Sequence, residues 1–352
     1  MAVTQNPDTV TIAIDAMGGD FGPTATVPAL DMVINGRPDL RFLVYGDESK
    51  INSVLEKHPR LKGRCDVIHT DKIIASDDKP SSALRASKGT SMRMAIEAVS
   101  SGQAQAIVSA GNTGALMALA KIVLRPISGI HRPAIASVMP GIKGDTIMLD
   151  LGANVLVDSE NLVQFALLGA IFAKAHKKID TPIVGLLNIG SEDIKGPEHV
   201  RGAAQILSKV DFPGEYYGFV EGDDIGKGIV DVIVADGYAG NIALKTIEGA
   251  GKLLRHYLTE SFNANPLAKL GGILAYFSLK KLKKKMDPRL YNGGVFLGLN
   301  GLCIKSHGGA DALGFSSAVI MAQRLARSGY IEQVAKDVNH LTSQETFLTL
   351  QE

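Results

Sequence analysis

The sequence contains no tryptophan, and aromatic residues make up only 5% of its 352 residues. Its formal net charge at pH 7 is +1, from 37 basic and 36 acidic residues. Proteins that bind single-stranded nucleic acid stack bases on aromatic side chains, and dedicated nucleic-acid-binding domains carry a strongly basic surface. We therefore expect no nucleic-acid partner for this chain.

Cysteine is also scarce, since the chain has only Cys65 and Cys303. Two distant cysteines cannot form a disulfide framework, so we expect both to be small buried side chains in a reducing compartment. The first ten residues lack the basic start and the apolar core of a secretory signal. No stretch approaches ~18 consecutive apolar residues, so no segment should span a membrane. These absences favour a cytoplasmic protein.

What the sequence does contain is an alternation of short apolar runs and helical patterns. This alternation predicts an α/β fold with a mostly parallel sheet flanked by helices on both faces. Strands are expected at 10–15, 41–46, 65–69, 104–109, 134–139, 145–150, 182–188, 216–220 and 230–236, and helices near 23–35, 48–58, 88–101, 113–124, 158–176, 197–209 and 240–260. No internal repeat or linker divides the chain, so residues 1–352 are expected to form a single unit.

Glycine is abundant, at 38 residues, and it clusters where the apolar runs end. The first such turn, Asp15-Ala-Met-Gly-Gly-Asp20, contains Gly18 and Gly19 and is either a structural turn or a loop whose N–H groups face a ligand. The second is Ser109-Ala-Gly-Asn112-Thr113-Gly114, which opens a helix. Asn112 or Thr113 could simply cap this helix, or its free N–H groups could bind phosphate or a developing oxyanion.

Three further glycine-containing turns also carry polar residues at the ends of expected strands. Leu149-Asp150-Leu151-Gly152-Ala153-Asn154 ends a strand in polar groups, and Asp150 is either a buried turn former or a site residue. The loop 188–196, Asn-Ile-Gly-Ser-Glu-Asp-Ile-Lys-Gly, carries Lys195, which could hold an anion as a point charge or be a solvated surface residue. The turn 236–241, Asp-Gly-Tyr-Ala-Gly-Asn, contains Gly240 and Asn241 and opens another helix.

The sixth motif is a glycine-rich stretch from Tyr291 to Gly309 that includes His307, which is either structural or catalytic. No histidine pair at i, i+4 and no cysteine pair suggests a metal site, and no G-x-S-x-G or G-x-G-x-x-G motif is present. Ligands bind at the carboxyl ends of strands in such sheets. The residues therefore predict an enzyme whose glycine turns converge on an anionic substrate, with no metal and no covalent nucleophile.

Residues 261–285 depart from the α/β pattern. An apolar part at about 266–279 is followed by five lysines at positions 280, 281, 283, 284 and 285. A short apolar helix beside a basic cluster can lie on an anionic membrane surface, can be a core helix with a solvated end, or can dock an acidic protein. The apolar strip and its lysines are Leu267, Leu270, Ile273, Leu274, Phe277, Lys281 and Lys284.

The six motifs, in this order, resemble those of the phosphate acyltransferase (PlsX) family, the fatty acid and phospholipid synthesis proteins of bacteria. The matching stretches are DAMGGD at 15–20, SAGNTGA at 109–115, LDLGAN at 149–154, NIGSEDIKG at 188–196, DGYAGN at 236–241 and GG-x-x-LG-x-x-G at 293–301 with His307-Gly308 after it. They cover the chain from about residue 10 to 330.

The resemblance implies transfer of a long-chain acyl group from acyl carrier protein to inorganic phosphate, without a cofactor. The acyl phosphate would feed glycerol-3-phosphate acylation, with the membrane glycerol-3-phosphate acyltransferase as a partner. The fold would be Rossmann-like, similar to isocitrate dehydrogenase and phosphate acetyltransferase, with residues 261–285 protruding from the unit as an amphipathic, basic helical hairpin. The protein would be a homodimer, peripherally associated with the inner face of the cytoplasmic membrane.

In this reaction phosphate is itself the nucleophile, so the enzyme positions phosphate against a thioester and stabilises an oxyanion. We hypothesise that Lys195 binds phosphate or the oxyanion, that Asn241 donates a hydrogen bond, and that His307 moves a proton. The expected substrate-binding residues are Asp15, Gly18, Gly19, Asn112, Thr113, Gly114, Asn154 and Gly240.

Three alternatives stay open. A phosphate acetyltransferase-like enzyme would use acyl-CoA and need a small acetyl pocket. A decarboxylating dehydrogenase of the related fold would need an arginine cluster and acidic metal ligands, which the sequence does not offer. A membrane scaffold without activity would not need so many glycine turns at strand ends.

Overall fold

The computed structural model describes residues 9–285 and 287–344, with side chains at 283–285 and 288 left out. Its strands are β1 Val10–Asp15, β2 Leu40–Gly46, β3 Cys65–His69, β4 Ala106–Ser109, β5 Ala134–Met139, β6 Thr146–Leu149, β7 Ile183–Leu187, β8 Glu215–Val220, β9 Val232–Val234, β10 Gly294–Leu297 and β11 Leu302–Lys305. Its helices are α1 Pro23–Val33, α2 Glu48–Leu55, α3 Pro80–Ala86, α4 Ser91–Ser100, α5 Thr113–Val123, α6 Ser159–Lys177, α7 Glu198–Leu207, α8 Asp224–Lys227, α9 Gly237–Asn263, α10 Pro266–Leu274, α11 Tyr276–Lys285, α12 Ala312–Ala326 and α13 Tyr330–Thr342. Two 3₁₀ turns, η1 Pro59–Leu61 and η2 Pro288–Tyr291, complete the set.

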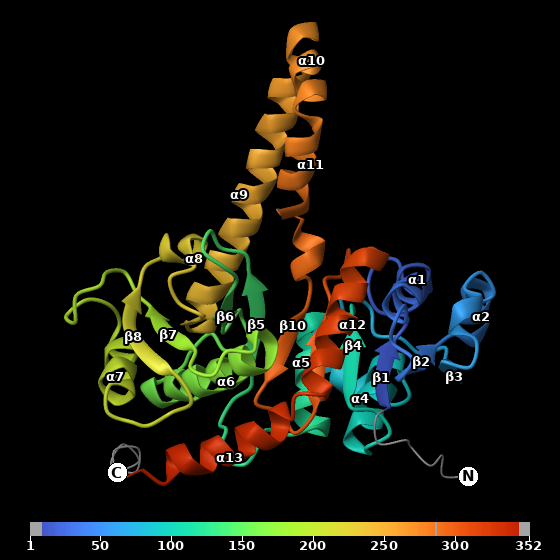
Figure 1. The fold of residues 1–352 in the computed structure, drawn as a ribbon. Helices are drawn as coiled ribbons and strands as arrows, with labels where there is room; N and C mark the ends of the chain where they lie inside the picture. The colour runs from blue at the N-terminus through green and yellow to red at the C-terminus, as the bar shows by residue number, and fades with distance from the viewer. Residues whose placement is uncertain (1–8, 286, 345–352) are drawn as a thin grey trace.

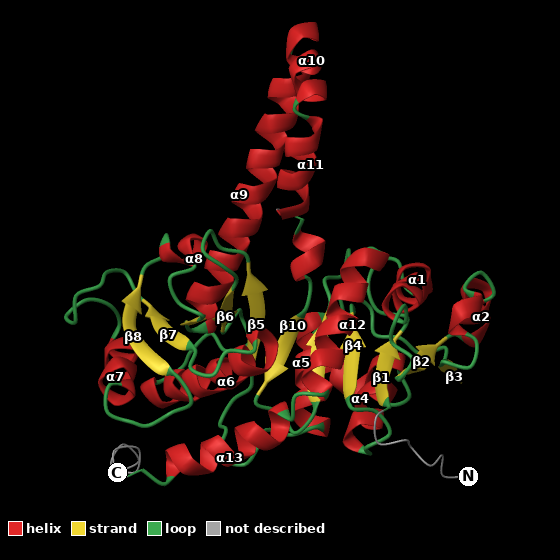
Figure 2. Cartoon of the chain, viewed as in Figure 1, coloured by secondary structure: helices red, strands yellow, loops and turns green. Residues whose placement is uncertain are grey.

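The strands form one sheet in the order β3-β2-β1-β4-β11-β10-β5-β6-β9-β7-β8, with helices packed on its faces (Figures 1 and 2). The prediction of a mostly parallel α/β sheet is confirmed. Three neighbouring pairs at its centre are antiparallel, namely β11 with β10, β10 with β5, and β5 with β6. Consequently β6, β9, β7 and β8 run opposite to β1, β2, β3, β4 and β11.

Every strand and helix that the sequence predicted is present, with ends shifted by a few residues. The strands β10 and β11 and the helices α3, α8, α12 and α13 were not predicted. The two strands have four residues each and lie in the glycine-rich stretch, so they are too short to show an alternating pattern. Their antiparallel pairing, which joins the two halves of the sheet, could therefore not be predicted from the sequence.

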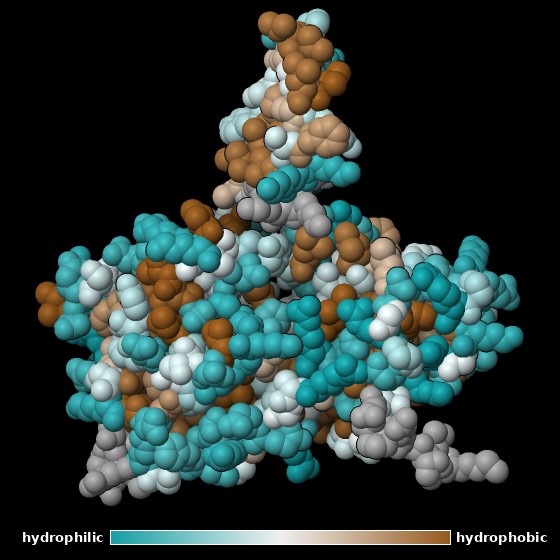
Figure 3. Space-filling view, in the orientation of Figure 1, coloured by the Kyte–Doolittle hydropathy of each residue, from teal (hydrophilic) through white to brown (hydrophobic). Residues whose placement is uncertain are grey.

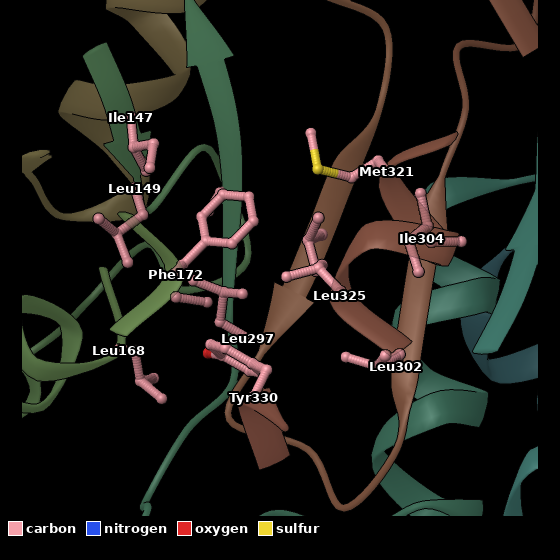
Figure 4. Packing of buried hydrophobic residues seen from close by; sticks show 14 of the residues in the cluster. Ile147, Leu149, Leu168, Phe172, Leu297, Leu302, Ile304, Met321, Leu325 and Tyr330 are labelled. Carbon is pink, nitrogen blue, oxygen red and sulfur yellow. The ribbon is translucent and has the colours of Figure 1, made fainter. Parts of the chain in front are cut away.

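The largest hydrophobic cluster runs through both halves of the sheet. The helix α6 is central to it, because residues 161–173 are all buried, as expected of a helix that is apolar on every side. In Figure 4 Phe172 of α6 lies between Leu149 of β6 and Leu325 of α12. The ring of Phe172 also meets Tyr330 of α13 edge-on, with 6.5 Å between ring centroids. The two halves of the sheet therefore share one core.

The helices α9, α10 and α11 leave this core and form a hairpin that rises from the body (Figure 1). The helix α9 has 27 residues and is therefore about 40 Å long at ~1.5 Å per residue. Gly237 and Gly240, both in its first turn, are the buried residues of α9, and α10 packs back against it near the tip. The expected helical protrusion thus begins well before residue 261.

We predict that Phe172→Ala lowers the free energy of unfolding by about 3–5 kcal/mol, because it leaves a cavity at the centre of the shared core. Urea denaturation followed by circular dichroism measures this loss. Met32→Ala on α1 is the matched control, since Met32 is 51% exposed and should change the midpoint little. Equal effects of the two substitutions would contradict this account of the core.

Candidate functional site

The predicted motifs form two groups of strand-end loops. We call residues 15–20, 109–114 and 305–309 the pocket group, because these loops line a cavity of about 290 Å³. We call residues 150–154, 188–196 and 236–241 the α9 group, because they follow the neighbouring strands β6, β7 and β9 and include the start of α9. Among the described residues, no hydrogen bond or ion pair joins one group to the other. The groups lie at the carboxyl ends of oppositely directed strands, which the sequence-based expectation of a single converging site did not include.

Asp15 holds the pocket group together from inside. It is the last residue of β1 and is 1% exposed. Its two carboxylate oxygens accept hydrogen bonds from the hydroxyls of Ser91 and Ser109, both at 2.7 Å. Burial raises the pKa of Asp15, and the hydrogen bonds from the two serines oppose that rise. Because both oxygens are occupied, Asp15 acts on the pocket by fixing the loops around it.

Glycine is required where these loops touch. A Cβ on Gly18 would lie 2.6 Å from the amide nitrogen of Gly111. Gly19 has a φ of +84°, and a Cβ there would lie 2.7 Å from the carbonyl oxygen of Gly308. The amide of Asp20 donates to that same carbonyl at 2.9 Å. Gly18 and Gly19 thus let three strand-end turns come together at the pocket.

Asn112 caps the helix α5 at the pocket wall. Its Oδ1 accepts from the amide of Ala115 at 3.0 Å. Its Nδ2 donates to the carbonyls of Ser76 and Asp78, at 3.0 and 2.8 Å. Asn112 therefore ties the loop 73–78 over the start of α5, while Thr113 lines the pocket directly. The next residue, Gly114, lies against Pro80, since a Cβ on it would be 2.8 Å from the Pro80 ring.

Lys305 is a pocket residue that the sequence-based prediction missed. It ends β11, and its Nζ donates to the carbonyl oxygens of Ala110 (3.3 Å) and Ser306. Burial lowers the pKa of Lys305 to about 8, although the neighbouring carboxylate of Asp15 opposes the shift. An ammonium group beside the N-terminus of α5 makes this cavity suitable for an anion. The signal in the sequence was a single charged residue directly after the apolar run Leu-Cys-Ile.

His307 follows Lys305 on the same turn. Its amide donates to Oδ1 of Asn292 at 2.9 Å, and its Nδ1 accepts from the amide of Gly309 at 3.1 Å. A neutral His307 therefore carries its proton on Nε2, the atom left for a ligand. Cys303 of β11 is fully buried, and this burial raises the pKa of the Cys303 thiol. Cys303 is therefore unsuited to act as a nucleophile.

A second buried carboxylate organises the α9 group. Asp150 is fully buried and accepts from the amides of Ile135 and Ala153 at 3.0 Å. It also accepts from the amide and the side chain of Asn154, at 2.7 and 2.9 Å. Burial raises the pKa of Asp150, and the hydrogen bonds from Ile135, Ala153 and Asn154 oppose the rise. The Asn154 side chain donates in addition to the carbonyl of Pro133, so it too is engaged within the protein.

The start of α9 packs tightly against this turn. A Cβ on Gly240 would lie 1.9 Å from the carbonyl oxygen of Asp150, so glycine is needed there. Asn241 donates one amide N–H to the carbonyl of Leu151 at 3.2 Å. Asp236 caps α9 through the amide of Ala239 at 2.8 Å. The second N–H of the Asn241 amide is available in addition to this bond.

Lys195 lies on the exposed loop 188–196. Its Nζ pairs with Oε1 of Glu192 at 2.8 Å, and its side chain is 47% exposed. The hydrogen bond that Lys195 donates to Glu192 raises the pKa of Lys195. Asn188 fixes the loop by donating to the carbonyl of Lys195 at 3.1 Å. Lys195 is thus a charged residue presented to solvent, whereas Lys305 is held inside a pocket.

The hairpin presents apolar side chains to its surroundings. Figure 3 shows them gathered near its tip. Ile273 is 70% exposed, and Leu267, Leu270, Leu274 and Phe277 are exposed as well. Lys281 is exposed on α11, and the side chain of Lys284 lies outside the described residues. Among the described residues, no helix is long and apolar enough to cross a membrane, and no cluster of candidate metal ligands occurs.

Known structures share the fold. The EutD phosphotransacetylase from Staphylococcus aureus matches with a TM-score of 0.60 and 17% identity, covering 92% of this chain and 96% of its own. A phosphotransacetylase from Streptococcus pyogenes matches with the same TM-score and identity, covering 92% and 95%. At this identity the likeness concerns the fold alone.

Sequence comparison is more specific. A family model described as fatty acid synthesis protein matches residues 10–333. A phosphate acyltransferase from Parvibaculum lavamentivorans is 51% identical over 338 residues, covering 96% of this chain and 94% of that protein. One from Paramagnetospirillum magneticum is 49% identical, covering 96% of each chain. The resemblance of the six motifs is confirmed: the chain belongs to the phosphate acyltransferase family of fatty acid synthesis proteins, enzymes that transfer an acyl group to phosphate.

Proposed function

We propose that this enzyme takes a long-chain acyl group from acyl carrier protein, and that inorganic phosphate binds in the pocket group. The observation that carries the proposal is the half-buried ammonium of Lys305, which lines the cavity beside the N-terminus of α5. Three glycine-containing turns surround the same cavity. A phosphate bound there would meet positive charge and backbone N–H groups without a metal or cofactor.

The reaction follows from this arrangement. A phosphate oxygen attacks the thioester carbonyl carbon, the new C–O bond forms, and the C–S bond breaks. The products are acyl phosphate and the carrier thiol, which takes up a proton. The attacking hydrogen phosphate brings that proton, and we assign His307 the role of passing it on or of donating a hydrogen bond from Nε2, because its Nδ1 is occupied by the amide of Gly309. In this scheme the pocket supplies position and charge, and the chain provides no covalent nucleophile.

Lys195 and Asn241 are proposed to bind phosphate or the oxyanion from the α9 group. Lys195 is half exposed and has N–H groups beyond the one that it donates to Glu192, and Asn241 has a second amide N–H beyond the one that it donates to Leu151. Because the oxyanion forms on the carbon that the phosphate attacks, this role requires the α9 group to reach the pocket when substrate is bound. We further propose that the enzyme works as a homodimer in the cytoplasm and passes its product to the membrane glycerol-3-phosphate acyltransferase.

We predict that the protein releases thiol from palmitoyl-acyl carrier protein only when phosphate is present, with acyl phosphate as the second product. Release from palmitoyl-CoA but not from the carrier would instead make it an acyl-CoA enzyme.

In the same assay, Lys195→Ala should reduce turnover about 100-fold or more if Lys195 stabilises the oxyanion. Near-normal turnover in the folded variant would remove Lys195 from the mechanism.

The pKa of Lys305, about 8, predicts a pH dependence. Lys305 is protonated below pH 8 and loses its charge as the pH rises through 8, so the KM for phosphate should rise above that pH. Lys305→Arg should keep the charge and flatten the profile, because arginine stays protonated. Lys305→Met should raise the KM at pH 7 by about 10-fold or more, since a hydrogen bond to a charged group contributes ~1.5–3 kcal/mol. An unchanged profile in Lys305→Met would place phosphate elsewhere.

The hairpin is proposed to rest on an anionic membrane, with its apolar strip in lipid and Lys281 and Lys284 toward the head groups. Ile273→Ser/Leu274→Ser should abolish flotation with anionic liposomes, because these side chains are strongly exposed and apolar. Ile194→Ser is the matched control, being 84% exposed on the loop 188–196. Unchanged flotation with lost turnover on the carrier substrate would show that the hairpin receives the carrier protein instead.

A further inference from the structure

Four basic side chains lie on the segment that covers the pocket. They are Lys72, Lys79, Arg85 and Lys88, and all four are exposed. We call these four residues the basic rim. None of them forms an ion pair with another residue in the part of the chain that the structure describes. Between Lys79 and Arg93 the sequence contains no acidic residue. Asp71, Asp77 and Asp78 lie beside Lys72 and Lys79, so the unbalanced positive charge is concentrated at Lys79, Arg85 and Lys88.

The contacts of this segment place the basic rim beside the pocket opening. Ile73 to Ser76, directly after Lys72, line the cavity. Asn112 holds the carbonyl of Asp78, the residue before Lys79, at 2.8 Å. Pro80, the first residue of α3, lies against Gly114 at the start of α5. The helix α3, which carries Arg85, packs along α5.

Other contacts hold the backbone at Lys72 close to the backbone that follows Lys88. The amide of Ser91 donates to the carbonyl of Lys72 at 3.0 Å. The hydroxyl of Thr70 donates to the carbonyl of Gly89 at 2.6 Å. A Cβ on Gly89 would lie 3.8 Å from the Lys72 side chain. The basic rim is thus a surface supported by hydrogen bonds at both ends of the segment.

We propose that the basic rim is the docking surface for an acidic protein that carries the acyl group and inserts its arm into the pocket. This inference rests on the proposed use of a carrier protein as donor. Exposed acidic and apolar side chains, Asp77 and Ile73, are interspersed with the cations. That mixture suits a folded acidic partner with its own pattern of charges better than the uniform negative charge of a lipid surface. A carrier bound here would present its thioester directly at Lys305.

The test measures binding separately from turnover. Acyl carrier protein with a palmitoyl group attached through a non-transferable amide is titrated with the enzyme, and fluorescence anisotropy gives Kd at low and high salt. Lys79→Ala/Arg85→Ala/Lys88→Ala should raise Kd by about tenfold or more at low salt and weaken its salt dependence, because charges at an interface rim steer association. Lys280→Ala/Lys281→Ala on α11 is the matched control and should bind as the unchanged protein does.

Several outcomes would overturn the proposal. Equal Kd values for the triple variant and the unchanged protein, with both folded, would exclude the basic rim as the docking surface. A loss of binding in the α11 variant alone would move docking to the hairpin. Reduced flotation of the triple variant with anionic vesicles, with carrier binding intact, would make the basic rim a lipid surface. Failure of the unchanged protein to bind the carrier would refute the proposed donor itself.

Discussion

The pocket depends on the buried carboxylate of Asp15. An ionised carboxylate inside a protein is unfavourable by several kcal/mol unless donors surround it. Here the hydroxyls of Ser91 and Ser109 bind its two oxygens, and they come from α4 and from the end of β4. One interaction thereby ties together the ends of two neighbouring strands and a helix. The glycines that follow β1 and β4 approach each other closely because this contact fixes where the strands end.

A comparable contact recurs in the second half of the sheet. Asp150 is also buried at a strand end, and it collects amide donors from β5 and from its own turn. The carbonyl of Asp150 meets Gly240, so the first turn of α9 is seated on the same group. In both polar turns a buried carboxylate is therefore fully hydrogen-bonded within the protein. The roles in chemistry that we propose fall to neighbouring residues, such as Lys305, His307 and Asn241.

The helix α9 connects the second turn with the hairpin. Its first turn packs on Asp150, and its last turns carry the apolar side chains away from the body (Figure 1). Since a continuous helix is stiff over this length, contacts at the start of α9 contribute to the orientation of the hairpin. The proposed lipid-facing surface and the proposed substrate-binding loops thus share one structural element.

The sequence by itself determined most of the fold and the family. Strands such as 183–187 are continuous apolar runs, and local hydrophobic pattern is set by adjacent residues, so these elements and the six motifs could be recognised directly. Tertiary structure decided the rest. The strands β10 and β11 are too short to show a pattern, yet their antiparallel pairing means that the motifs follow strands of two opposite directions. Lys305 resembled any strand-end lysine until folding placed it half-buried beside α5, because burial and proximity depend on residues distant in sequence.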